Sequence, residues 1–366
     1  MKRFAALRRV GWCSFGALGL TVPIGFWYRP EVDLRDGYWV HTKDRRIPVP
    51  DSGVWWEAFR SSRAVSPDEG DALVLRVARW LVIMSVSLVF RTALKVFNTF
   101  EVDRDENFGR FLQFVESRPP GSALITVSNH SSTIDDPTLL VASMPWRVLI
   151  DTSKIRWVFC TQDICFRRPI LAGIASAGKV LPIKKGGGID QPLLAEVQRR
   201  IAQGCWLHIF PEGKVNQCRQ LGIGHYDNRP ASTAAEIGRM KWGVGKLVAH
   251  SPVPVTLIPL HHVGMDDILV MQREPPYSLD LGSSRMGQRV RLIVGEEIHF
   301  KDLVEEHERV HGAVPKFIAS EGDLRLSSSA EKILYSRITR RVEDALMQLE
   351  QRGLAAWNQQ VAVATG

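Results

Sequence analysis

The chain has 366 residues, with 47 lysines and arginines against 39 aspartates and glutamates, so its formal net charge is +8. This length suits one large or two ordinary domains and is ample for a buried core, and the positive excess favours anionic partners such as membrane surfaces or phosphates. Nucleic acid is the least favoured partner, because the sequence shows no zinc-finger spacing, no aromatic RNA-binding signature and no long basic run. The five cysteines include no Cys-x-x-Cys pair, which argues against a disulfide framework or a zinc site.

Residues 1–70 are predicted to form an extension with a targeting or anchoring role. Four lysines and arginines among the first nine residues lead into a mostly apolar segment at about residues 8–28, and no acidic residue comes before Glu31. This bias fits a mitochondrial presequence, a signal peptide or a signal-anchor helix. The segment is barely long enough to span a bilayer, and its glycines and Pro23 weaken it as a helix, so the three interpretations stay open.

Residues 72–98 form a second apolar stretch, which opens the main predicted domain at 71–351. The eleven residues from Trp80 to Phe90 carry no charge, and basic residues lie on both sides of them. Eleven residues are too few to cross a bilayer, whereas an apolar stripe with basic flanks can lie in the plane of the membrane interface. We therefore predict an interfacial helix here, with a core helix as the alternative.

From Ala123 onward the sequence alternates between short apolar strands and helical patterns. This alternation predicts an α/β fold in which helices flank a central sheet. The predicted strands are 123–128, 179–183, 205–210, 254–260 and 289–294. The predicted helices are 137–144, 190–203, 231–250 and 331–351. The charged and then serine-rich segment 302–330 is predicted to be a loop or insertion, and residues 352–366 a C-terminal tail.

A histidine and an aspartate follow the first of these strands. His130 comes two residues after the strand, and Asp135 lies five residues further on. In one continuous helix they would point about 140° apart, so the Ser-Ser-Thr turn between them must bend if they are to touch. In contact, the carboxylate would fix the imidazole tautomer and stabilise the imidazolium, so that the other ring nitrogen can take a proton from a hydroxyl. A turn histidine beside a carboxylate at a helix N-terminus is the alternative.

Two further segments carry groups suited to a phosphate or a glycerol hydroxyl. After the strand 205–210, a carboxylate, a glycine and a lysine follow one another as Glu212, Gly213 and Lys214. The carboxylate can accept hydrogen bonds, the glycine allows close backbone approach, and the lysine supplies a point charge. Two adjacent lysines before a run of three glycines form the other segment, which can also receive a phosphate. The alternatives are an ordinary surface turn and a solvated loop.

Three histidines, in or directly after predicted strands, receive no ligand role. His208 lies in the middle of a strand and is expected to be a satisfied core residue. His261 and His262 follow the strand 254–260, but further metal ligands cannot be placed, so no metal site is predicted.

Together these segments resemble the glycerolipid acyltransferase superfamily and, within it, the tafazzin family. His130 and Asp135 match the superfamily's His-x4-Asp motif, and the likeness covers about residues 75–351. Lys214-Val215-Asn216 is typical of tafazzins, whereas lysophosphatidate enzymes usually continue with Thr-Arg-Ser. The other matching segments are Ile125-Thr126-Val127-Ser128-Asn129, Asp136-Pro137, Asp163-Ile164-Cys165-Phe166, Gly178-Lys179, Pro182, His208-Ile209-Phe210-Pro211-Glu212-Gly213, Lys241-Trp242-Gly243 and His262-Val263-Gly264-Met265.

The sequence departs from the tafazzin pattern at three places. Lys185 stands where an arginine is usual, which removes bidentate phosphate geometry. His261 stands where tryptophan is common, and residues 218–234 look like an insertion.

The resemblance implies an interfacial transacylase that moves acyl chains between phospholipids and lysophospholipids without CoA and remodels cardiolipin. It implies that His130 acts as general base and that Asp135 stabilises the imidazolium. The implied substrate contacts are Asn129, Lys184, Lys185, Glu212, Gly213 and Lys214. No metal, nucleotide or other cofactor is implied.

The lipids implied are cardiolipin, monolysocardiolipin and phosphatidylcholine, at mitochondrial inner or outer membranes facing the intermembrane space. We expect monotopic attachment to the membrane surface through residues 72–98 and 253–270. An acyl-CoA-dependent lysophosphatidate acyltransferase and a non-catalytic membrane-binding scaffold are the alternatives.

Overall fold

The computed structural model describes residues 73–166, 169–184, 186–191, 193–215, 240–269, 284–318 and 326–365. The expected targeting segment at 8–28, the expected insertion at 218–234 and the side chain of Lys185 lie outside these residues.

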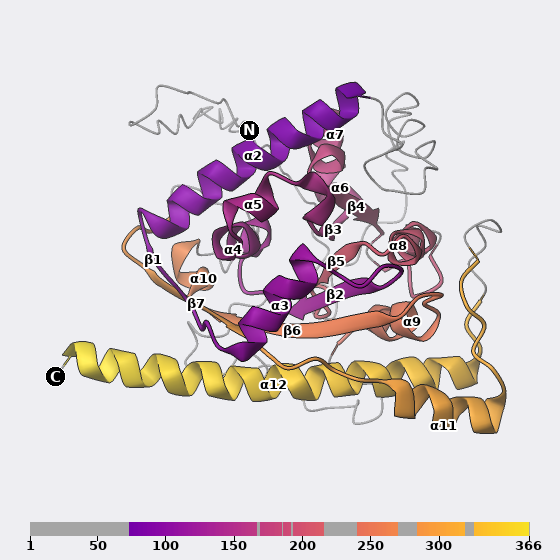
Figure 1. Cartoon of the computed structure of the whole chain (residues 1–366). Coiled ribbons are helices and arrows are strands. Elements are labelled where there is room, and N and C mark those ends of the chain that lie inside the picture. Colours follow the sequence, from indigo (N-terminus) through magenta and orange to yellow (C-terminus); the bar gives the residue numbers. More distant parts are fainter. Residues whose placement is uncertain are drawn as a thin grey trace, which may run out of the picture.

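A seven-stranded sheet forms the centre of the fold (Figure 1), in the order β1-β7-β6-β2-β5-β3-β4. Neighbouring strands are parallel except for β6 and β7, which pair antiparallel. All six residues of β2 are buried, as expected for a central strand with helices on both faces. The strands are β1 (Thr99–Val102), β2 (Ala123–Ser128), β3 (Trp157–Thr161), β4 (Val180–Ile183), β5 (Trp206–Ile209), β6 (Val255–Val263) and β7 (Arg289–Val294).

Helices cover both faces of this sheet. They are α2 (Leu73–Lys95), α3 (Glu106–Glu116), α4 (Asp135–Ser143), α5 (Trp146–Leu149), the 3-10 turn η1 (Thr152–Lys154), α6 (Gln162–Cys165), α7 (Pro169–Ala177), α8 (Leu193–Ala202), α9 (Gly243–Ala249), α10 (Met265–Ile268), α11 (Lys301–His311) and α12 (Ser329–Thr365). In Figure 1, the long α12 runs along one side of the sheet, and α2, α4 and α5 lie on the other.

Alternate residues of β2 separate two hydrophobic cores. Ile125 faces the core formed with α8, α9 and α12, whereas Leu124 faces the core formed with α3 and α4. The α/β fold with a helix-flanked sheet is therefore confirmed.

Each of the five strands predicted from sequence coincides with a strand of the sheet, while β1 and β3 were missed. The helix predicted at 331–351 is longer than expected, because α12 continues to Thr365 through the expected tail. The loop predicted at 302–330 is wrong at its beginning, where α11 forms and packs against α12. Of the helix predicted at 231–250, the described residues contain α9.

The two stretches expected at the membrane differ in structure and in exposure. α2 is a helix of 23 residues, long and apolar enough by length and composition to cross a membrane, and it is mostly exposed. Residues 255–263, in contrast, form β6, which lies between β7 and β2 and is largely buried. Within the apolar run at 253–270, residues 255–263 therefore belong to the sheet, and the predicted membrane contact is wrong for them.

A disulfide joins Cys160, in β3, to Cys165, at the end of α6. The cysteine count had argued against a disulfide framework, and this local bond corrects that expectation for one pair. The chain turns from β3 directly into α6, which brings the two Cα atoms to 6.0 Å although five positions separate them.

Candidate active site

The candidate site lies at the carboxyl ends of three strands in the middle of the sheet. β2 is parallel to both of its neighbours, β5 and β6, so all three end at the same edge. Ligands of α/β folds commonly bind outside this edge, where loops follow the strands. Here it gathers residues 129–135 after β2, residues 210–214 after β5 and the end of β6.

His130 and Asp135 are in contact across the turn between β2 and α4. Nδ1 of His130 lies 3.0 Å from Oδ2 of Asp135. The same oxygen accepts hydrogen bonds from the backbone N–H groups of Ser131 and Ser132, at 2.7 and 2.8 Å. The predicted bend is therefore present. The backbone holds the buried carboxylate in place, while His130 keeps 19% of its side chain exposed.

This geometry leaves Nε2 of His130 as the ring nitrogen suited to proton exchange with a substrate. With Nδ1 facing the carboxylate, the tautomer that donates from Nδ1 has its lone pair on Nε2. Asp135 can then stabilise the imidazolium that forms when Nε2 takes a proton.

Two residues after β5 hold His130 from the other side. The ring of Phe210 stacks on the imidazole with centroids 4.0 Å apart and planes inclined by 17°. Oε1 of the buried Glu212 accepts a hydrogen bond of 3.0 Å from the backbone N–H of His130. Glu212 therefore fixes the histidine's backbone, a role that its place in the sequence does not suggest.

A second histidine approaches the same carboxylate from β6. Nε2 of the buried His262 lies 3.0 Å from the backbone oxygen of Asn129 and 3.5 Å from Oδ2 of Asp135. The Asn129 amide in turn donates to the carbonyl of His262 and accepts from its N–H, at 2.9 and 3.0 Å. These bonds hold the turn at residues 129–135 against β6 and place Asn129 in the buried framework of the candidate site.

His208 is a satisfied core residue, as predicted from its position in the middle of β5. Its Nδ1 lies 2.9 Å from the hydroxyl of Thr126, and its Nε2 lies 3.3 Å from the hydroxyl of Ser128. Burial, and to a lesser extent the positive charge of Arg156, lowers the pKa of His208 well below its usual range. His208 is therefore neutral at pH 7, and its ring binds side chains of β2.

The N-terminus of α4 is held by a buried ion pair. Arg156, just before β3, forms a two-pronged contact with the carboxylate of Asp136, with Nε 2.6 Å from Oδ1 and Nη2 on Oδ2. Such bidentate pairs fix both distance and orientation. The pair therefore sets the position of α4 next to Asp135.

The remaining predicted contacts lie toward solvent. Gly213 and Lys214 are exposed directly after Glu212, and Gly213 adopts a φ of +67°, a conformation that favours glycine. Lys184 is exposed after β4, at the same edge of the sheet but two strands away from β5. Lys214 thus follows closely on Glu212, which contacts the turn at residues 129–135, whereas Lys184 lies further along the edge of the sheet.

Several polar atoms around the pair have no hydrogen-bond partner among the described residues. These are Oδ1 of Asp135 and the hydroxyl oxygens of Ser131, Ser132 and Thr133, all buried. Buried polar atoms are normally paired, so a cluster of unpaired ones is unusual outside functional sites. This turn therefore retains hydrogen-bonding capacity where the proposed chemistry occurs.

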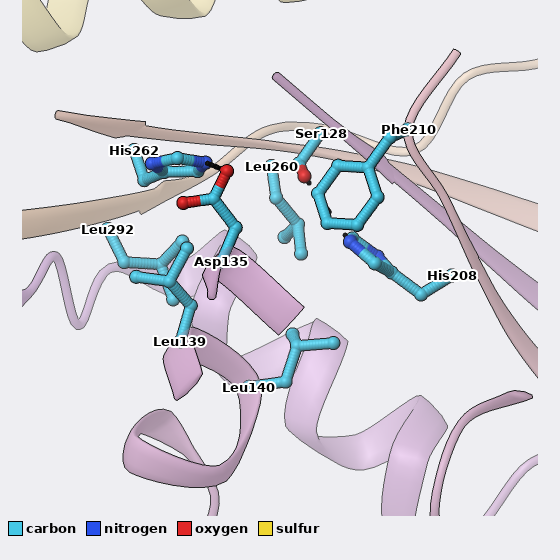
Figure 2. A pocket seen from close by; sticks show the side chains of 9 residues that line it. All are labelled: Ser128, Asp135, Leu139, Leu140, His208, Phe210, Leu260, His262 and Leu292. Atoms are coloured by element: carbon cyan, nitrogen blue, oxygen red, sulfur yellow. Dashed lines mark hydrogen bonds and ion pairs between the residues drawn. The ribbon is translucent and has the colours of Figure 1, made fainter. Parts of the chain in front are cut away.

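A small cavity lies beneath the turn (Figure 2). Asp135 and His262 meet at one side of it, and His208 and Phe210 stand at the other. The rest of its lining is Ser128 with the apolar residues Leu139, Leu140, Leu260 and Leu292.

The Acyltransferase family model matches residues 99–263. The chain is 37% identical over 228 residues to N-acylphosphatidylethanolamine synthase of Arabidopsis thaliana, covering 61% of this chain and 72% of that protein. It is 32% identical over 228 residues to tafazzin of Drosophila melanogaster, covering 62% of this chain and 53% of the relative. Identity is also 32% over 188 residues to taffazin of Dictyostelium discoideum, covering 50% and 58%. The chain thus spans little more than half the length of these tafazzins.

The chain therefore belongs to the Acyltransferase family, as its resemblance to the glycerolipid acyltransferases predicted. It is an acyltransferase with tafazzins among its relatives, and these relatives support phospholipids as its substrates.

Proposed function

We propose that this acyltransferase moves acyl chains between phospholipids and lysophospholipids without CoA, and that cardiolipin is among the lipids that it remodels. The observation that carries the proposal is the His130–Asp135 contact, with the carboxylate anchored by two backbone N–H groups. We base the choice of lipids, and of a mitochondrial membrane facing the intermembrane space, on the resemblance to tafazzins, which are among the relatives of this chain.

In the proposed reaction, Nε2 of His130 takes the proton of a free glycerol hydroxyl on the lysolipid. The oxygen attacks the ester carbonyl of the donor phospholipid, and Asp135 stabilises the imidazolium. When the tetrahedral intermediate collapses, the imidazolium returns the proton to the leaving glycerol oxygen. One ester bond breaks and one forms, so no metal, nucleotide or redox partner is required.

We assign the remaining predicted residues to two roles. Asn129 and Glu212 position the catalytic turn, because their side chains bind the backbone of His262 and His130. Gly213 and Lys214 are proposed to receive the glycerol and phosphate, with Lys184 or Lys185 as a second phosphate contact. Lys214→Ala should then weaken use of the phospholipid without changing the melting temperature.

A second function is favoured by the relative that is 37% identical, whose name states that it makes N-acylphosphatidylethanolamine. The same site suits this reaction, because a general base can equally take a proton from the ammonium group of phosphatidylethanolamine, so that the free amine attacks an ester and the proton passes to the leaving glycerol oxygen. The two functions differ only in the acceptor, a hydroxyl or an amine.

One assay separates these functions. Purified protein receives phosphatidylcholine as donor, with monolysocardiolipin and phosphatidylethanolamine as competing acceptors, in the presence and absence of acyl-CoA, and products are identified by mass. We expect a new ester on monolysocardiolipin without CoA, and a loss of about 10²–10⁴-fold in His130→Ala. An amide product would select the second function. Strict dependence on acyl-CoA would refute the transacylase, and turnover unaffected by His130→Ala would refute the mechanism.

A further inference from the structure

Helices α5, α6 and α7 lie on the side of the sheet where α2 runs (Figure 1). They carry several exposed apolar side chains. We call this the α5–α7 surface, and it consists of Trp146, Ile150, Ile164, Ile170 and Ile174. Ile170 and Ile174 stand one turn apart on α7 and are 79% and 49% exposed, and α7 contains no charged residue. A helix without a polar face normally packs in a protein core or in lipid.

The α5–α7 surface adjoins α2. α2 packs against both α5 and α7. Its own outward residues include Leu73, Val77 and Leu81, each at least half exposed. Exposed apolar side chains that gather on neighbouring helices, rather than singly, mark contacts with a membrane or a protein.

Charge identifies the occupant. α2 is apolar enough to cross a membrane by its length and composition. Its exposed basic side chains, Arg76 and Lys95, lie near its two ends. Apolar burial with basic residues around it is the pattern of an interface with anionic lipid.

We propose that the α5–α7 surface is a second membrane contact beside α2 and that it lies on an anionic phospholipid bilayer. This would place the active site close to the lipid, because α4 begins at Asp135 and packs against α2. A lipid chain would then reach the catalytic turn without crossing bulk water.

The direct test places a polarity-sensitive fluorophore at position 170. Ile170→Cys is labelled in a Cys13→Ser, Cys218→Ser background, where Cys205 is buried and Cys160 and Cys165 are paired. The matched control is Val310→Cys on α11, whose valine is 72% exposed. Vesicles of phosphatidylcholine with phosphatidylglycerol should shift the emission of the label at 170 to the blue and leave the label at 310 unchanged. Vesicles of phosphatidylcholine alone should produce a smaller shift.

Two results would overturn the proposal. Emission at 170 that stays aqueous on vesicles to which the protein is bound would show that the α5–α7 surface faces water. Emission at 170 that is already apolar before vesicles are added would show that another segment or a second copy covers it.

Binding provides an independent measure. The double variant Ile170→Asp, Ile174→Asp should weaken flotation with anionic vesicles at least about tenfold, given the usual gain from burying an isoleucine side chain. The control, Val310→Asp with Ile333→Asp, replaces equally exposed residues on α11 and α12 and should bind like the parent. Both should keep acyl transfer in detergent micelles, which separates a failure of this surface from a failure of the proposed function. Unchanged flotation of the double variant would refute the contact.

Discussion

At the scale of single residues, the site depends on one carboxylate oxygen. Oδ2 of Asp135 accepts from the N–H groups of Ser131 and Ser132 and contacts His130. The two backbone donors would keep this oxygen in place even without the imidazole. The histidine, in contrast, depends on the carboxylate for its tautomer and its charge.

Asp135→Asn should therefore lower acyl transfer severely, by about 10³–10⁴-fold, while the protein still binds membranes. The amide carries no negative charge, so it cannot stabilise the imidazolium as the carboxylate does. Turnover with a phospholipid donor and a lysolipid acceptor measures the effect. Asp151→Asn, which changes a half-exposed carboxylate in the cap of η1, serves as control and should retain activity. Activity within a few fold of the parent in Asp135→Asn would contradict the mechanism.

His262 is expected to act as a positioning residue. His262→Ala removes the imidazole nitrogen that lies 3.0 Å from the backbone oxygen of Asn129. Leaving this buried oxygen without its partner costs about 1–3 kcal/mol. Because the cost falls on the turn that holds His130, kcat should fall roughly ten- to hundredfold. His262→Gln keeps a donor and should recover part of the rate. A fall in kcat with unchanged KM at a fixed folded fraction is the diagnostic result. A rate that simply follows the folded fraction would show a structural role alone.

At the scale of elements, the sheet is closed on one face by the long α12. α12 packs against α9 and β6, and its buried residues Leu334, Tyr335 and Ile338 join the core behind the site. Close approach is possible because α9 carries a glycine at the crossing. A Cβ atom at Gly245 would lie 2.3 Å from the backbone oxygen of Tyr335.

Gly245→Ala should consequently destabilise the fold by several kcal/mol, because backbone at that distance cannot move without separating α9 from α12. The matched control lies in the same helix. A Cβ at Gly243 meets nothing within 4 Å, so Gly243→Ala should be neutral or slightly stabilising. Denaturant unfolding of both variants measures the difference. Equal midpoints would show that the helices can separate at little cost.

At the scale of the whole molecule, folding keeps several histidines uncharged. Burial is the largest cause that lowers the pKa of His208, His250 and His307 below the usual value of 6.5. The unfolded chain therefore binds more protons than the native protein at mildly acidic pH. Aspartates with a lowered pKa, such as Asp302 at about 2 beside Arg341, titrate well below this range.

The free energy of unfolding should accordingly fall as the pH drops from 7 through 6.5 and below. In this range the histidines of the unfolded chain bind protons, whereas the same histidines stay neutral in the native protein, so protonation favours the unfolded state. A fully buried histidine such as His208 contributes a slope of up to about 1.4 kcal/mol per pH unit. Urea midpoints at pH 7, 6 and 5 should show a shallower dependence for His208→Gln than for the parent. An identical slope would mean that His208 does not titrate on unfolding.

The sequence by itself determined the local structure and the family. The apolar run before His130 predicted β2, and the polar turn after it predicted the bend that joins His130 to Asp135, because both depend on neighbours within a few residues. β1 was missed because its four residues are only partly buried and leave no alternating pattern. The charged sequence of α11 predicts a loop, because few apolar residues mark it as a helix. Packing on α12 makes the segment an ordered helix.

Only the tertiary structure decided what surrounds the pair. Asn129 and His262 are 133 positions apart and Glu212 lies 82 positions from His130, so no local pattern reports their hydrogen bonds. The apolar run at 253–270 illustrates the same limit, because a central strand and a membrane stretch have the same composition. The order of strands in the sheet distinguishes them: β6 lies between β7 and β2, where the sheet and its covering helices exclude lipid.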